Sequence, residues 1–356
     1  MHRRTFSRRL ALAVGAGALL PACDVQARNE QPQERASQQK ARLRAKPLKT
    51  GDTVGLITPG SYIPDRDLAK AMQNMASLGL QVKPGKHLRA LRGFTAGTDE
   101  QRLDDLHSMF ADPEVDAIWC ARGGYGCTRL LPNLDFELIR RNPKILIGYS
   151  DITALTTAIF QETGLICFHG PVAASTFTPY TRQQLQEILF SARDSHTIRP
   201  SEAYADREDP LYQSLLLQSG TARGLLIGGN LSLLASLAGT PWALQPAGKL
   251  IFIEDVEEKP YRIDRMLTQL AQSSPLDQAA GFALGIFAGC IPEPNDRSLS
   301  LSETLAGQFT PMGKPTVYGL TFGHIAHQCT LPVGVQAELR ADQRTIQLLE
   351  SWLVDA

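Results

Sequence analysis

Three absences narrow the classes of protein to which this chain of 356 residues can belong. It has no excess charge of either sign, because 36 Lys and Arg balance 36 Asp and Glu, and its body has no basic run with interleaved aromatic residues. The composition therefore does not favour nucleic-acid binding. No apolar run reaches the roughly 20 residues of a membrane-spanning helix, and no internal repeat is visible. With 43% hydrophobic and 20% charged residues, the chain can form one large or two medium globular domains.

Cysteine is also scarce, and its spacing indicates neither a metal site nor a redox motif. The six cysteines include no CxxC pair and no readable disulfide pairing. Cys120 and Cys167 lie in apolar, strand-like runs, where a free cysteine behaves as a small hydrophobic residue. We therefore expect buried thiols in the body of the protein.

The first 23 residues differ in kind from the rest. Four arginines among the first nine residues precede an uncharged apolar stretch at 10–22, which is the pattern of an export signal. The arginine pairs resemble a twin-arginine signal, and Leu20-Pro21-Ala22-Cys23 resembles a lipoprotein cleavage box with Cys23 as the lipidated residue. An ordinary signal cut after Ala27 is the alternative. We predict removal of residues 1–22 and an exported, periplasmic protein.

Residues 23–47 are polar, rich in Gln and Arg, and almost free of apolar side chains. Such a segment cannot bury enough surface to order itself. We predict a disordered tether, which would hold a folded domain off the membrane if Cys23 carries lipid.

From Thr53 onward, short apolar segments alternate with amphipathic ones, which predicts an α/β fold with a parallel sheet covered on both faces. The pattern loosens at 176–220 and then resumes. We predict an N-terminal α/β domain at 48–175, a connecting segment at 176–220 and a smaller C-terminal α/β domain at 221–350. The expected helices are 67–78, 98–110, 152–162, 181–190, 262–272 and 301–309.

A lone serine stands at the corner between a predicted strand and a predicted helix, in KILIGYSDITAL. The carboxyl ends of parallel strands are where α/β proteins collect their chemistry. In a sharp turn the Ser150 hydroxyl would leave the sheet, and the amide of Asp151 could face a developing oxyanion. Ile152 stands where the GxSxG motif of α/β-hydrolases has glycine, so this is not that motif. The alternative reading of Ser150 is a helix N-cap.

A nucleophilic serine needs a base, and the base needs an acid that orients it. His324 follows a strand-like segment in GLTFGH, and acids follow another in LIFIEDVEE. From the residues alone, the choice among Glu254, Asp255 and Glu257 stays open. The HIAH sequence has two histidines without further spaced ligands, which is weak evidence for a metal.

Six motifs occur along the chain in an order that resembles the LD-carboxypeptidases, the serine peptidase family of the muramoyltetrapeptide carboxypeptidases. The resemblance covers about 54–339. The motifs are RGGYG (122–126) with RLL (129–131), GYSD (148–151), FHGP (168–171), GGNLSLLASLAGTPW (228–242), IEDVEEKPYRIDRML (253–267) and GLTFGH…TLPVG (319–334).

The resemblance implies a catalytic triad of Ser150, Glu254 and His324, with an oxyanion hole formed by the backbone amides of Gly124 and Asp151. It implies an N-terminal and a smaller C-terminal α/β domain with the active site between them. The implied reaction is hydrolysis of terminal D-alanine from murein tetrapeptide stems through an acyl-enzyme, without metal or organic cofactor. A homodimer is also implied.

Well-known members of the family act in the cytoplasm, whereas this chain carries an export signal, so the substrate could be intact peptidoglycan rather than recycled fragments. A cytoplasmic location is the alternative. Two other functions are considered: a related serine peptidase that inactivates peptide antibiotics, as the microcin-immunity hydrolases do, and a catalytically dead murein-binding lipoprotein. Cys127 after RGGYG could suggest a thiol enzyme, but no base matches it, and we interpret it as packing.

Overall fold

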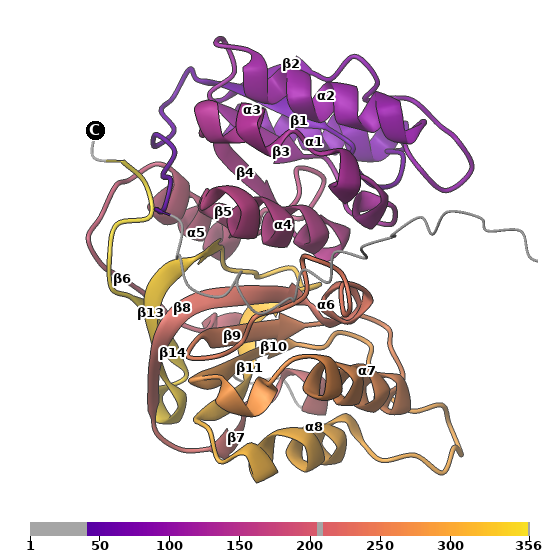
Figure 1. Ribbon diagram of the computed structural model, residues 1–356, viewed down its shortest axis with the longest axis vertical. Coiled ribbons are helices and arrows are strands. Elements are labelled where there is room, and N and C mark those ends of the chain that lie inside the picture. Colours follow the sequence, from indigo (N-terminus) through magenta and orange to yellow (C-terminus); the bar gives the residue numbers. More distant parts are fainter. Residues whose placement is uncertain (1–40, 205–208, 355–356) are drawn as a thin grey trace, which may run out of the picture. The chain divides into compact units, whose positions relative to one another are not determined.

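The structure is a computed structural model, which describes residues 41–204 and 209–354 (Figure 1). The predicted export signal, the predicted lipidation of Cys23 and most of the predicted tether lie outside the described residues. Within the described part of the chain, no helix is both long and apolar enough to cross a membrane.

The first sheet has six strands in the order β12-β5-β4-β3-β1-β2. Five of them are parallel, and β12 runs antiparallel to β5. The strands are β1 (Thr53–Ile57), β2 (Gln81–Pro84), β3 (Ala117–Cys120), β4 (Ile145–Gly148), β5 (Cys167–His169) and β12 (Leu331–Val333). The helices that accompany them are α1 (Asp65–Ser77), α2 (Asp99–Ala111), α3 (Phe136–Arg141), α4 (Thr153–Thr163) and α5 (Pro179–Leu189).

Helices cover both faces of this sheet, because the apolar residues of each strand alternate between two cores. Ile147 of β4 belongs to the same core cluster as Met75 of α1. Its neighbour Leu146 belongs to the second cluster, with Leu106 of α2 and Leu155 of α4. Strands buried on both faces are apolar throughout rather than alternating, as ILIG at β4 shows. The predicted α/β fold is confirmed.

The second sheet has eight strands in the order β6-β14-β13-β8-β9-β10-β11-β7. Its four central strands, β8 to β11, are parallel, and antiparallel strands flank them. The strands are β6 (His196–Ile198), β7 (Leu215–Gln218), β8 (Thr221–Asn230), β9 (Leu250–Glu254), β10 (Gly281–Ile286), β11 (Thr316–Gly323), β13 (Val335–Arg340) and β14 (Thr345–Leu348). The helices that follow its central strands are α6 (Leu231–Ser236), α7 (Pro260–Ser273) and α8 (Leu301–Phe309).

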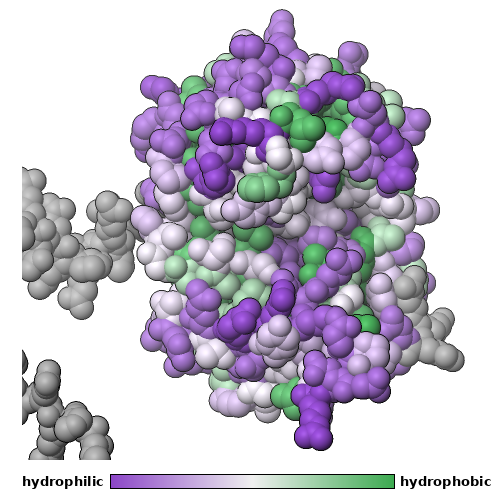
Figure 2. Space-filling model, turned by 90° about the vertical axis from the view of Figure 1, so that its right-hand side faces the viewer, coloured by the Kyte–Doolittle hydropathy of each residue, from purple (hydrophilic) through white to green (hydrophobic). Residues whose placement is uncertain are grey.

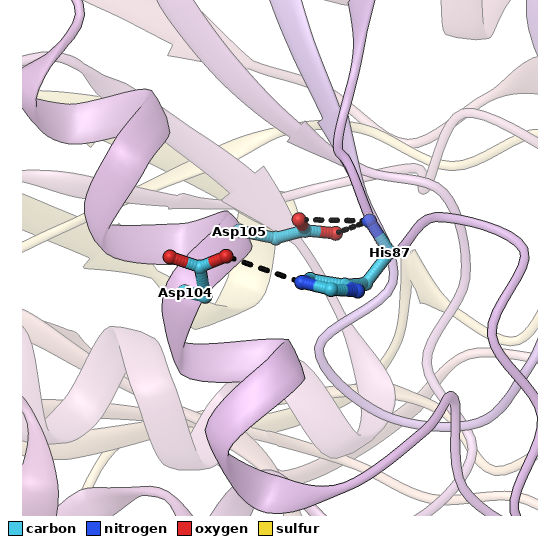
Figure 3. Close-up of side chains that lie close together, drawn as sticks. All are labelled: His87, Asp104 and Asp105. Carbon is cyan, nitrogen blue, oxygen red and sulfur yellow. Dashed lines mark hydrogen bonds and ion pairs between the residues drawn. The ribbon is translucent and has the colours of Figure 1, made fainter.

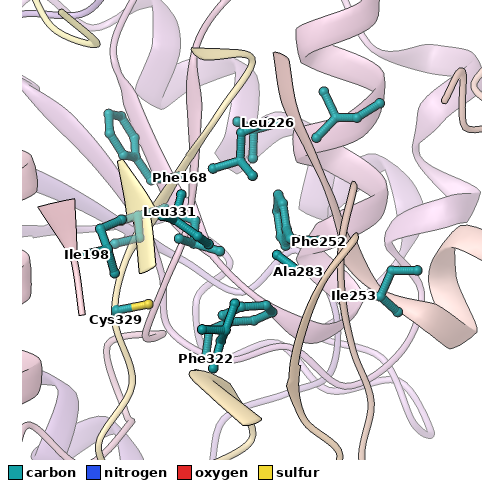
Figure 4. Close-up of a cluster of buried hydrophobic side chains, with 14 of the residues drawn as sticks. Phe168, Ile198, Leu226, Phe252, Ile253, Ala283, Phe322, Cys329 and Leu331 are labelled. Carbon is teal, nitrogen blue, oxygen red and sulfur yellow. The ribbon is translucent and has the colours of Figure 1, made fainter. Parts of the chain in front are cut away.

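One apolar cluster joins residues from strands of both sheets (Figure 4). It includes Phe168 of β5, Phe252 of β9, Phe322 of β11 and Leu331 of β12, all of them fully buried. The rings of Phe252 and Phe322 pack edge to face with their centroids 5.8 Å apart. Continuous packing of this kind fixes the strands that carry the polar residues described below.

The end of the predicted tether packs against the folded body. Arg42 forms an ion pair with Glu350, and Leu43 bridges to Leu165. Ala45 is 1% exposed, and its carbonyl accepts a hydrogen bond from Val354. The expectation of disorder up to residue 47 is therefore wrong for 42–47, because Ala45 is buried, Leu43 is half-buried and Arg42 is paired.

The described surface carries mostly polar side chains with small apolar patches between them, as one face shows in Figure 2. Phe94 and Tyr125 are exposed aromatic residues, and their rings contact each other with centroids 5.1 Å apart. Tyr125 belongs to the RGGYG loop, so this aromatic pair lies beside the segment that the resemblance assigns to the oxyanion hole.

Candidate active site

Ser150 lies two residues after the end of β4, at the first position of a 3-10 turn (Ser150–Ile152) that leads into α4. Its φ is +64°, a left-handed conformation that costs a non-glycine residue about 1–3 kcal/mol. Gly148 permits the bend, because a Cβ there would lie 2.8 Å from Ile152 Cγ1. Ser150 does not cap α4, whose N-cap residue is Ile152 without a side-chain bond. The helix-cap interpretation of Ser150 is therefore wrong.

The RGGYG loop lies against Ser150. A Cβ at Gly123 would come within 3.0 Å of Ser150 Cβ and 3.4 Å of the Asp151 nitrogen. Gly124 has φ +104°, and a Cβ there would lie 2.6 Å from Ser61 Cβ, so only glycine fits between Ser61 and the loop. The loop's approach to Ser150 depends on both glycines.

Ser61 fixes the peptide at Gly124 from both sides. Its backbone N–H donates to the carbonyl of Gly123 at 3.1 Å, and its hydroxyl accepts the N–H of Tyr125 at 3.1 Å. Sequence analysis missed Ser61, although it stands in the loop that follows β1, in ITPGS, and a loop after a strand is also where Ser150 was found.

The carboxylate of Asp151 holds the end of the same loop. It is buried, and its Oδ2 accepts the N–H of Cys127 at 3.0 Å. Burial raises the pKa of Asp151, against the lowering effect of the hydrogen bonds from Cys127. The side chain of Asp151 is therefore structural, which leaves its backbone amide as the group that could serve chemistry.

Glu254 and His324 meet although 70 residues separate them. Glu254 ends β9 and is fully buried, and His324 directly follows β11. His324 Nδ1 lies 2.8 Å from Glu254 Oε2. A Cβ at Gly323 would lie 2.9 Å from the same Oε2, so the GLTFGH glycine allows this approach. The structure thus pairs His324 with Glu254, the first of the three acids that the residues alone left open.

In this pair each group shifts the pKa of the other in the direction opposite to the effect of burial. Burial lowers the pKa of His324, but the charge and hydrogen bond of Glu254 outweigh it, so the net pKa is raised above 6.5. Burial likewise raises the pKa of Glu254, and His324 outweighs it, so that pKa is lowered. The ring of Tyr149, next to Ser150, packs on His324 with centroids 4.7 Å apart. Among the described residues, the hydrogen bond of the His324 ring goes to Glu254 and none joins it to Ser150.

Asp255 is excluded as the partner of His324 by its own bonds. It accepts hydrogen bonds from Asn230 Nδ2 at 3.0 Å and from the Ser232 hydroxyl at 2.8 Å, at the start of α6. Burial, with the adjacent Glu254 charge, raises the pKa of Asp255 to about 6. Asn230 in turn donates its backbone N–H to Thr153 Oγ1 at 3.0 Å, which links the strand beside Glu254 to the helix that follows Ser150. The segment that begins with GGN is one of the family motifs, but nothing in the sequence predicted the hydrogen bond between Asn230 and Thr153.

The other histidines have structural surroundings. His107 Nε2 accepts the N–H of Asp135, the residue that caps α3. His196 lies in β6 and pairs with Glu187. His169 is buried at the end of β5, where burial lowers its pKa to about 4 and its Nε2 has no partner among the described residues.

His87, Asp104 and Asp105 form a group whose ligand atoms lie within 4.8 Å of one another (Figure 3). Both oxygens of Asp105 accept the backbone N–H of His87, and the His87 ring pairs with Asp104 at 3.1 Å. These bonds close the turn after β2, so the cluster has a structural role.

All five cysteines between 41 and 354 are free and buried, as expected. Burial raises the pKa of the Cys127 thiol well above its usual range. A thiolate nucleophile at this position is therefore disfavoured.

Two family models match this chain: the LD-carboxypeptidase N-terminal domain over 54–170 and the LD-carboxypeptidase C-terminal domain over 223–339. The chain belongs to the LD-carboxypeptidase family. A probable murein peptide carboxypeptidase of Bacillus subtilis is 42% identical over 305 residues, which cover 84% of this chain and 92% of that protein. The murein tetrapeptide carboxypeptidase of Pseudomonas aeruginosa is 38% identical, with 82% and 94% covered.

Solved structures of the family have the same fold. The muramoyltetrapeptide carboxypeptidase of Oxalobacter formigenes gives a TM-score of 0.72 at 30% identity, covering 85% of this chain and all of that one. A microcin C7 self-immunity protein, solved with adenosine monophosphate, gives a TM-score of 0.79 at 26% identity, with 88% and 100% covered. Membership of the LD-carboxypeptidase family identifies the chain as a carboxypeptidase, a hydrolase.

Proposed function

We propose that this LD-carboxypeptidase is a serine enzyme that removes the terminal D-alanine from murein tetrapeptide stems, with Ser150, His324 and Glu254 as its triad. The observation that carries the proposal is the buried Glu254–His324 pair, 2.8 Å apart at the ends of the parallel strands β9 and β11, which flank β10 in the second sheet. The strained, uncapped conformation of Ser150 supports it, as do the names of the two murein carboxypeptidase relatives.

In the proposed reaction, His324 Nε2 takes the proton of the Ser150 hydroxyl while Glu254 holds Nδ1 and stabilises the imidazolium. Ser150 Oγ attacks the carbonyl between the L-centre of the diamino acid and D-alanine. The amides of Gly124 and Asp151 donate to the oxyanion, and such a donor is worth about 10²–10³ in turnover. His324 returns the proton to the leaving amine, and water then hydrolyses the acyl-enzyme. These steps use only the side chains and amides named.

An apo structure can lack the hydrogen bond between nucleophile and base, which often tightens only with substrate. The Tyr149 ring, one residue before Ser150 and in contact with His324, supports the proximity that the mechanism needs.

A second candidate function is hydrolysis of a peptide antibiotic. The microcin C7 self-immunity protein of Escherichia coli is 28% identical over 340 residues, and its solved form has the TM-score given above. This function would use the same triad, so it differs from the first only in substrate.

The test is release of D-alanine from a defined murein tetrapeptide by the purified protein, beside a Ser150→Ala variant, with and without a chelator. We expect release that survives the chelator and disappears in the variant. Release lost to chelation would overturn the triad mechanism. Release from a peptidyl-nucleotide amide but from no tetrapeptide would favour the second function, and substrate binding without any hydrolysis would indicate a dead binding protein.

We also propose that the protein is exported, tethered through lipid on Cys23, and homodimeric. Cell fractionation with labelled fatty acid, comparing the natural chain with Cys23→Ala, tests the first two points: label lost in the variant supports lipidation, and unlabelled protein in the cytosol would contradict it. The mass in solution tests the third.

A further inference from the structure

The RGGYG loop begins with an arginine whose charge is not neutralised. Arg122 is half-buried, and no acidic side chain pairs with it among the residues that the structure describes. Its Nη1 donates to the carbonyl of Tyr62 at 3.1 Å. Two other arginines near the same loop are paired, because Arg102 and Arg129 both bind Asp99.

The backbone places Arg122 beside Ser150. In the β3–β4 register Trp119 is opposite Ile147, so Arg122 and Ser150 each stand three residues beyond a paired position. Gly123, the next residue, would bring a Cβ within 3.0 Å of Ser150 Cβ. The bond from Arg122 to Tyr62 ties the guanidinium to the segment that also holds Gly124. It is therefore a cation fixed on the loop that lies against the nucleophile.

A cation at this place would match the substrate of a carboxypeptidase. It cuts the last peptide bond, so the free carboxylate of its substrate lies one residue, about 3.8 Å between Cα atoms, from the scissile bond. The acids that act on His324 are Glu254, Asp255 and Glu257, and their charges would repel the terminal carboxylate of the substrate. The planar guanidinium of arginine matches a carboxylate with two parallel hydrogen bonds.

We infer that Arg122 binds the C-terminal carboxylate of the substrate and so restricts the enzyme to the last peptide bond. The inference rests on the proposed function in one respect, the position of the scissile bond at Ser150. The Arg122 guanidinium keeps donors free for the carboxylate while Nη1 stays on Tyr62, because five N–H groups are available.

The alternative role for Arg122 is to tie two loops together through Tyr62. A purely structural arginine would support the reaction of every substrate equally, whereas a carboxylate-binding arginine would support only substrates with a free acid. The two roles are therefore separated by the substrate, not by the variant alone.

The experiment compares two tetrapeptides of the same sequence, one ending in D-alanine and the other in D-alanine amide, with kcat/KM measured for each. The natural protein should prefer the free acid by about 10- to 100-fold, the worth of one charged hydrogen-bonded contact. Arg122→Gln should lose this preference because kcat/KM falls for the free acid, whereas kcat/KM for the amide should stay within about threefold of the natural value. Arg122→Lys should keep part of the preference. Arg129→Gln, which removes a paired arginine from the same region, is the matched control and should keep all of it.

Equal loss on both substrates in Arg122→Gln would overturn the inference, as would a natural protein without preference. Urea unfolding midpoints of the variants show that they are folded. If Ser150→Ala still releases D-alanine from the free acid and its counterpart from the amide, the serine mechanism is overturned, but the preference for the free acid can still be measured. Failure of the proposed mechanism is therefore distinguishable from failure of the inference about Arg122. If the natural protein releases nothing from either peptide, both the inference and the proposed murein function are overturned.

Discussion

Replacement of Gly229 by alanine should disturb both stability and catalysis, because this glycine lies where the segment carrying Ser150 meets the strand next to Glu254. Gly229 is in β8, one residue before Asn230, which is opposite Glu254 in the β8–β9 register. Its φ is +148°. A Cβ there would lie 2.6 Å from Thr153 Oγ1, 3.0 Å from Thr153 Cβ, and closer still to Thr153 Cγ2.

Two terms set the size of the effect. A non-glycine residue in a sparsely populated backbone conformation costs about 1–3 kcal/mol, and overpacking of a dense interior costs about 1–3 kcal/mol. Thr153 cannot rotate away without loss, since its Oγ1 accepts the N–H of Asn230. We expect the free energy of unfolding to fall by about 2–6 kcal/mol. We also expect the start of α4 to move away from β8, and a displacement near 1 Å lowers turnover by about 10²-fold.

The assay is urea unfolding together with kcat for tetrapeptide hydrolysis. Gly307→Ala is the matched control, because Gly307 is exposed within α8 and no atom lies within 4 Å of its added Cβ. That change should stabilise the protein by about 0.5–1 kcal/mol and leave kcat unchanged. A second variant, Thr153→Ala with Gly229→Ala, removes the two nearest atoms and should recover part of the loss. Natural stability and natural kcat in Gly229→Ala would refute the reasoning.

Three other changes test separate parts of the site. In the proposed mechanism the neutral form of His324 is the base, and its pKa is raised, so kcat/KM should rise with pH through a value above 6.5. Glu254→Gln removes the charge that raises this pKa but not the burial, so the inflection should move to lower pH and turnover should fall by about 10⁴-fold. An unmoved inflection would contradict the pairing. Ser61→Ala should lower kcat by about tenfold with little change in KM, because Gly124 loses one of the two bonds that orient it; a change in KM alone would argue for substrate contact instead. Iodoacetamide should leave the native enzyme active and its buried thiols unlabelled, whereas the urea-unfolded protein, as the positive control, should be labelled. Rapid labelling of the native enzyme with loss of activity would favour a thiol enzyme. The buried thiols are those of Cys120, Cys127, Cys167, Cys290 and Cys329.

The regular elements were predictable because local physics dominates them. The helix predicted at 98–110 begins after a capping box of Thr98 with Gln101, and the helix at 301–309 begins after a second box at Ser300. Both follow from short-range bonds between a side chain and the first free amides of a helix. The strand before Ser150 was equally visible, because a strand covered on both faces is apolar at every position.

Other features needed three-dimensional structure because distant segments create them. The choice of Glu254 over Asp255 depends on how the sheet places the end of β9 relative to the end of β11, with β10 between them, and on the bond from Asn230 that occupies Asp255. The addition of β12 to the first sheet, beside β5, comes from a segment more than 150 residues later in the chain and has no local signal. The role of Ser61 depends likewise on the loop that folds onto it.

Three residues of the site, Ser150, Glu254 and His324, have conformations or surroundings that lower the stability of the protein. A buried ion pair such as Glu254–His324 recovers little of its desolvation cost, and Glu254 Oε1 has no hydrogen-bond partner among the described residues. Ser150 adds backbone strain without serving as a cap. Elsewhere the buried acids Asp105, Asp151 and Asp255 each close a turn or cap a helix. Because the neighbouring acids are satisfied and structural, the costs at Ser150, Glu254 and His324 support the proposed chemistry, which needs a serine, a base and an acid at that place.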